Sequence, residues 1–97
     1  AKSLKVATYG YKHIPSAKMS WSDIVSSTKN GPSKFLKGTN VEKLTKQAWD
    51  SGQEVTNGKP WKVYKSDEVL GASSGKETKY MRVELTESTE ELHASPI

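Results

Sequence analysis

The spacing of apolar residues changes partway along the chain, from the period of a helix to the period of a strand. Two stretches before residue 52 repeat apolar side chains at intervals of three and four, which predicts two short amphipathic helices. The turn signal Asn57-Gly58 follows, and beyond it apolar and polar side chains alternate, which predicts β-strands. Helices first and strands afterwards are typical of an α+β domain.

Local signals delimit both predicted helices. Ser20 favours a helix start and residues 30–32, Asn-Gly-Pro, favour a stop. Thr39 or Asn40 can cap the second helix, and Gly52 can end it. The apolar stripes consist of Trp21, Ile24, Val25 and Thr28 in the first helix and Val41, Leu44, Thr45, Ala48 and Trp49 in the second. Because both helices are short, each needs a packing partner.

Four strands are expected, at residues 61–65, 68–72, 78–85 and 91–95, with a turn at 73–76. In the third strand, Met81, Val83 and Leu85 share one face, so we expect both helices to cover that face of a four-stranded antiparallel sheet. Residues 1–97 form one domain in this interpretation, with residues 1–19 as an N-terminal arm or loop.

Charge is distributed unevenly along the 97 residues. Residues 1–65 carry 12 lysines against 4 acidic residues, whereas residues 66–97 carry 3 basic against 7 acidic residues, and the net charge is +4. A basic region of this kind attracts polyanions, although lysines that only keep a small domain soluble are an equally good explanation of charge alone.

Composition excludes several kinds of chemistry. The chain has no cysteine, which excludes disulfides and thiolate nucleophiles, and two histidines without a carboxylate cluster make a metal site improbable, so no cofactor is expected. The apolar stretches are far shorter than the roughly 20 residues that span a bilayer, so the folded domain is not expected to cross a membrane. The start at Ala1 without a leader predicts a domain excised from a longer protein or a processed product.

The polar face of the last strands holds the candidate functional residues. Thr78, Tyr80, Arg82 and Glu84 alternate on one strand, and His93 and Ser95 alternate on the next. Such a surface carries the groups that RNA cleavage without metal requires, namely a base for the 2′-OH, an acid for the 5′-oxygen and cations for the phosphate.

Each candidate has an expected role. His93 is the expected acid or base because imidazole titrates near neutral pH, and Arg82, the only arginine, suits phosphate. Glu84 or His13 completes proton transfer, and Thr78 donates to a phosphate oxygen. The expected substrate-binding residues are Lys76, Lys79, Tyr80 and Ser95, with Tyr80 as a stacking surface for a base.

Plainer interpretations exist for the same residues. Arg82 and Glu84 on one strand face are more often a solvated ion pair, and a histidine near a C-terminus usually has no special function. The same holds for His13 in its loop. Trp21, Trp49 and Trp61 are interpreted as core residues because they lie on the apolar sides of their elements.

In six segments between residue 13 and the end of the chain, the sequence resembles the C-terminal toxin domains of contact-dependent growth inhibition and related polymorphic toxin systems of bacteria. The order and spacing of the segments carry the resemblance, which covers the chain from residue 13 to its end. The matching segments are His13-Ile14-Pro15-Ser16, residues 19–25, residues 28–32, residues 56–63, residues 71–78 and Leu92-His93-Ala94-Ser95-Pro96-Ile97.

The resemblance implies membership of the barnase, EndoU, colicin E5/D and RelE ribonuclease superfamily, in which two helices precede a four-stranded antiparallel sheet. It implies a toxin presented at the cell surface as the C-terminal part of a larger secreted effector, which cleaves RNA, often tRNA, in the cytoplasm of a neighbouring bacterium. It further implies a cognate immunity protein, which we expect to be acidic, and in some members a translation elongation factor as a partner. Apart from the immunity complex, we expect a monomer.

One departure from that pattern affects the candidate site. The toxin domains that the chain resembles commonly end in His-Gly-His-Pro, whereas this chain has His93-Ala94-Ser95-Pro96, so a second imidazole is missing there and Ser95 or His13 gains a larger role. The leading hypothesis is a metal-independent endoribonuclease that leaves a 2′,3′-cyclic phosphate. The alternatives are a non-catalytic RNA- or DNA-binding module and a pure protein-interaction domain.

Overall fold

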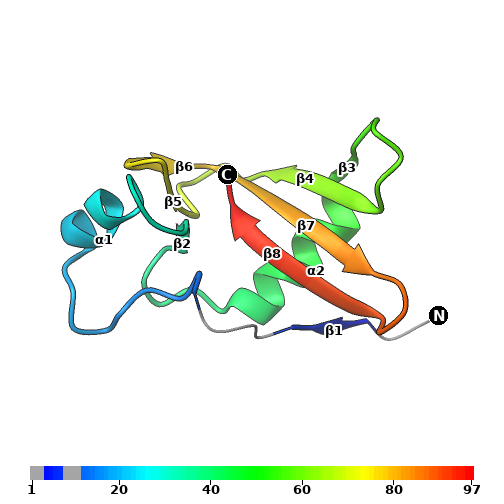
Figure 1. Ribbon diagram of the computed structural model, residues 1–97, viewed down its shortest axis with the longest axis horizontal. Coiled ribbons are helices and arrows are strands. Elements are labelled where there is room, and N and C mark those ends of the chain that lie inside the picture. The colour runs from blue at the N-terminus through cyan, green and yellow to red at the C-terminus, as the bar shows by residue number, and fades with distance from the viewer. Residues whose placement is uncertain (1–3, 8–11) are drawn as a thin grey trace.

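The computed structural model describes residues 4–7 and 12–97, and its larger sheet has five strands. Their order across the sheet is β1 (Lys5–Val6), β8 (Glu91–Pro96), β7 (Tyr80–Thr86), β4 (Trp61–Lys65) and β3 (Gln53–Glu54). β1 runs parallel to β8, and the other neighbours are antiparallel (Figure 1). β1 lies within the stretch expected as an N-terminal arm, so part of that stretch extends the sheet.

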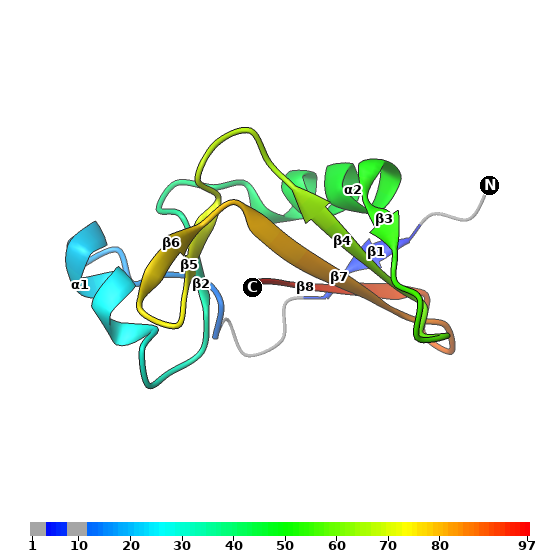
Figure 2. The same ribbon diagram turned by 90° about the horizontal axis from the view of Figure 1, so that it is seen from above.

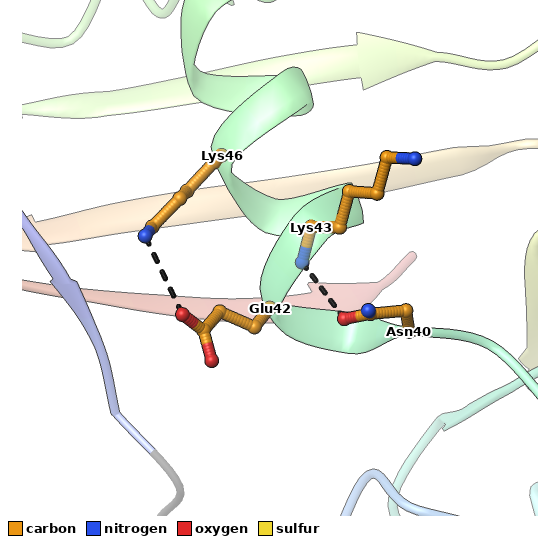
Figure 3. A network of polar contacts seen from close by, with 4 residues as sticks. All are labelled: Asn40, Glu42, Lys43 and Lys46. Carbon is orange, nitrogen blue, oxygen red and sulfur yellow. Dashed lines mark hydrogen bonds and ion pairs between the residues drawn. The ribbon is translucent and has the colours of Figure 1, made fainter.

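Helix α2 (Val41–Ser51) covers one face of this sheet (Figure 2). It begins where the Asn40 side chain accepts a hydrogen bond from the Lys43 backbone N–H at 3.1 Å, which satisfies one free amide of the first turn (Figure 3). It ends at Gly52, where a Cβ would lie 2.5 Å from the Ala48 carbonyl oxygen. The close approach of two backbones explains the glycine at this position.

The second sheet has three strands in the order β2 (Lys34–Phe35), β5 (Gly71–Ser73) and β6 (Lys76–Thr78). Ser74 and Gly75 join β5 to β6 with φ angles of 54° and 80°, as a two-residue turn with two left-handed positions requires. Helix α1 (Trp21–Ser27) packs on β5 and β6, and Thr28 Oγ1 accepts a hydrogen bond from the Gly75 N–H at 2.9 Å.

The core lies between α2 and the larger sheet, with β2 and the β4–β5 connection closing one end. Its fully buried members are Phe35, Ala48, Leu70, Met81, Val83 and Leu92. Met81 and Val83 point toward α2, so the alternate residues of β7 point away from it. No helix in the described residues is long and apolar enough to cross a membrane.

The prediction of two helices on one four-stranded antiparallel sheet is wrong, because the described residues form an α+β fold with two helices and eight strands in two sheets. The expected third strand is divided at Lys79, whose carbonyl accepts the Ser66 N–H at 2.8 Å. Residues before this point pair with β5, and residues after it pair with β4 and β8. The apolar series of Met81, Val83 and Leu85 stops before Lys79, because Lys79 and Glu77 occupy the next positions on that face, but this change does not reveal which strands pair on either side of it.

Candidate functional site

A cavity of about 680 Å³ lies beside β8, where the end of β1, residues 12–14 and the first turn of α2 meet. It extends from the side of the sheet opposite α2 to Val41 and Glu42 at the start of that helix. The polar residues of its lining are Lys12, His13, Glu42, Arg82, Glu84, Thr86, His93 and Ser95.

Strand register brings four of these side chains together. Arg82 lies opposite Ser95, and Glu84 lies opposite His93, in the antiparallel pair of β7 and β8. Residues directly opposite each other have Cβ atoms roughly 5 Å apart on the same side of the sheet. Arg82 and His93 therefore share one face and one cavity, as the proposed chemistry requires.

Arg82 is held from two sides. Its Nη2 donates to Glu84 Oε2 at 2.9 Å, and its guanidinium carbon lies 4.6 Å from the centre of the Trp61 ring. Among the described residues, Arg82 Nε is buried and has no hydrogen-bond partner. The guanidinium keeps donors that these contacts do not use, which is the arrangement that suits a phosphate oxygen.

His13 has a defined tautomer. Its Nδ1 lies 2.7 Å from the Ser33 carbonyl oxygen, which can only accept, so Nδ1 carries the proton and donates it. Burial lowers the pKa of His13 below its ordinary value of 6.5; the Ser33 bond opposes this, and the charges of Lys12 and Lys34 lower the pKa further. At neutral pH the imidazole is therefore neutral, with a lone pair on Nε2 that can accept a proton.

The start of α2 contributes a carboxylate to the cavity. Glu42 lines the cavity. Its Oε1 lies 3.4 Å from Nζ of Lys46, which follows one turn later on the same side of α2 (Figure 3). This pair is exposed, so it contributes little to stability. Glu42 and Glu84 give the cavity negative charge beside the cations Lys12 and Arg82.

The cavity unites five of the nine residues predicted from the sequence and leaves four outside its lining. The five are His13, Arg82, Glu84, His93 and Ser95. Thr78 and Lys76 belong to β6 in the smaller sheet, and Thr78 Oγ1 accepts the Tyr80 N–H at 3.1 Å. Lys79 lies between the two sheets, and Tyr80 lies at the start of β7.

The interpretation of all three tryptophans as core residues is wrong for two of them. Trp49 packs against the core. Trp21 donates from Nε1 to Glu77 Oε2 at 2.7 Å on the smaller sheet. Trp61 shares the sheet face of Arg82, because it lies opposite Glu84 in the register of β4 and β7. The stretch 61–65 has large apolar residues on both faces, so its pattern does not reveal which face is the core.

Sequence reasoning also missed Lys12, Ser33 and Glu42. Lys12 and Ser33 both affect the pKa of His13. They lie near its ring because residues 12–14 run beside β2, where the Phe35 N–H donates to the His13 carbonyl at 2.8 Å. No local pattern signals that contact. Glu42 was visible only as a first-turn acid of a helix.

Within residues 4–7 and 12–97, no three side chains of His, Asp or Glu gather closely enough to hold a metal ion. Comparison with protein-family models, with curated proteins and with solved structures finds no match for this chain. The lining of the cavity is therefore the structural evidence on function.

Proposed function

We propose that the protein is an endoribonuclease that cleaves RNA without a metal ion, through attack of the 2′-OH on the adjacent phosphate. The observation that carries the proposal is the lining of one cavity by both histidines and the only arginine of the chain. An acid, a base and a phosphate-binding cation are the minimum set for this reaction.

In the proposed reaction, His13 Nε2 takes the proton of the 2′-OH while the 2′-oxygen attacks phosphorus. The bond from phosphorus to the 2′-oxygen forms and the bond to the 5′-oxygen breaks, and His93 gives its proton to that leaving oxygen. His13 is then protonated and His93 is neutral, so His13 releases a proton and His93 takes one up before the next turnover. The products are a 2′,3′-cyclic phosphate and a 5′-hydroxyl end.

Arg82 is the proposed phosphate ligand. Charge builds on the non-bridging oxygens as the 2′-oxygen adds, and a guanidinium can donate to two of them at once. Glu84 holds the guanidinium at 2.9 Å and thereby directs its other donors. Ser95 lies opposite Arg82 and can donate to the same phosphate, which is the larger role expected for it because the toxin domains that the chain resembles commonly carry a second imidazole there.

The biological setting is proposed from the sequence resemblance alone. In that setting the chain is the toxin domain of a larger surface-presented effector, acts on tRNA in a target bacterium and is blocked by an acidic immunity protein. An inhibitor of this kind has to mask Lys12 and Arg82, which lie where phosphate would bind. A translation elongation factor as a further partner belongs to the same proposal.

The test is incubation of the purified chain with total RNA in EDTA, with and without bacterial extract, beside the variant His93→Ala. We expect fragments from the wild type and intact RNA from the variant. Intact RNA in every lane would contradict the proposal, and binding of RNA without cleavage would favour the non-catalytic RNA-binding module instead.

A further inference from the structure

The face of β4 and β7 opposite α2 carries aromatic rings beside cations. The residues of this aromatic face are Trp61, Val63 and Lys65 of β4 and Tyr80, Arg82 and Glu84 of β7. Their places follow from register, since Val63 lies opposite Arg82 and Lys65 lies opposite Tyr80. Figure 2 shows α2 on one side of these strands and no helix on the other.

Each ring of the aromatic face has a cation over it, in a cation–π contact. Lys65 Nζ lies 5.9 Å from the centre of the Tyr80 ring, and Tyr80 is 44% exposed. Lys59 Nζ lies 5.1 Å from the Trp61 ring, which also contacts the Arg82 guanidinium. Alternating rings and positive charges are the combination by which proteins hold single-stranded nucleic acid, because bases stack on the rings while the cations meet phosphates.

We propose that the aromatic face binds an unpaired RNA strand that continues into the cavity. The inference rests on the proposed ribonuclease function and deepens it by naming the substrate as unpaired RNA. Arg82 provides the continuity, because it contacts Trp61 on the aromatic face and also lines the cavity. Lys59, Lys65 and Arg82 supply the charge that complements a phosphate chain.

Geometry separates an unpaired strand from a duplex. Trp61 and Tyr80 lie four register positions apart along β7, a distance of about 13 Å at the rise of a β-strand. That distance exceeds the spacing of about 3.4 Å between stacked bases, so the two rings hold different nucleotides. Bases inside a duplex already stack on one another and offer no open face to a side chain.

The test uses a labelled 2′-O-methyl RNA of about eight nucleotides, within the site sizes known for single-strand binders. Its blocked 2′-oxygen cannot attack phosphorus, so binding is measured by fluorescence anisotropy independently of cleavage. We expect the single strand to bind more tightly than its duplex. We expect Tyr80→Leu to weaken single-strand binding about 5- to 100-fold and Tyr80→Phe to restore it.

Matched controls separate stacking and charge from general damage. Trp21→Leu removes an indole that bonds to Glu77 on the smaller sheet and should leave binding unchanged. Lys59→Gln and Lys65→Gln should each lower the slope of log affinity against log salt by about 0.7, whereas Lys43→Gln on α2 should not. Circular dichroism confirms that each variant is folded.

The outcomes distinguish the two proposals. Unchanged binding in Tyr80→Leu, equal binding of duplex and single strand, or no binding at low salt would overturn the inference. If the wild type binds the probe as expected yet never cleaves RNA, the ribonuclease proposal fails and the binding face stands. If the wild type cleaves RNA but Tyr80→Leu binds the probe and cleaves RNA normally, the proposed binding face fails and the ribonuclease proposal stands.

Discussion

The two faces of the larger sheet differ in what they do, although the same strands build both. On the face toward α2, Met81 and Val83 are fully buried. On the opposite face, the side chains of Arg82 and Glu84 are 37% and 34% exposed and line the cavity. Because side chains alternate along β7, residues that stabilise the core lie next to residues of the proposed active site. Substitutions on one face should therefore leave the function of the other face largely intact.

The largest difference between the effect on cleavage and the effect on stability is expected from His93→Gln on the cavity side. Loss of the proposed general acid should lower the rate of cleavage about 10²- to 10⁴-fold, while the free energy of unfolding should change by less than about 1 kcal/mol. Single-turnover cleavage and urea unfolding measure the two quantities. Equal losses in both would mean that the residue supports the fold and not the reaction.

Met81→Ala on the α2 side should give the opposite result. Removal of a buried methionine side chain costs about 2–5 kcal/mol of unfolding free energy, because burial is lost and a cavity is left. Below the unfolding transition, cleavage per folded molecule should match the wild type. A folded variant with a large loss of cleavage would break the separation between the faces.

A smaller effect is expected where α2 begins. Asn40→Ala removes the side-chain oxygen that accepts the Lys43 N–H and should cost about 1 kcal/mol. Asn40→Asp retains an acceptor there and serves as the control. Thermal unfolding compares the three proteins, and an alanine variant as stable as the wild type would show that the cap does not hold the helix that covers the core.

The smallest effect is a pH dependence from His13. Because its pKa in the folded state lies below 6.5, the unfolded chain binds more protons between that pKa and 6.5. The stabilisation is present above pH 6.5 and is lost as pH falls through the folded-state pKa. His13→Gln should remove this part of the slope in urea unfolding, and NMR titration of the ring should show the lowered pKa. An identical slope in the variant would contradict the assignment.

Local features of the fold were predictable from the sequence, whereas the pairing of strands with distant segments was not. Ser20 and Asn40 mark the helix starts by side-chain hydrogen bonds to nearby amides, so the sequence alone locates both helices. The strand at 61–65 is confirmed, and Gly52 ends α2 as expected. The division at Lys79 depends on pairing with distant segments, which alternation does not encode.

The candidate site divides in the same way. Arg82 and Glu84 share a face by period alone, and antiparallel register adds His93 and Ser95. His13 reaches the cavity only because its segment bonds to Phe35 and Ser33, contacts between residues some twenty positions apart. Trp61 was predicted to lie on the apolar side of its strand, but residues 61–65 have large apolar residues on both faces, so the pattern does not identify the core face.

The most direct measurement of the central claim is the chemistry of the RNA ends. Mass spectrometry of fragments made by the wild type in EDTA should find 2′,3′-cyclic phosphates paired with 5′-hydroxyls, and His13→Gln and His93→Gln should lose both together. Fragments ending in 3′-hydroxyls and 5′-phosphates, or the same fragments at undiminished rate from either variant, would contradict the account.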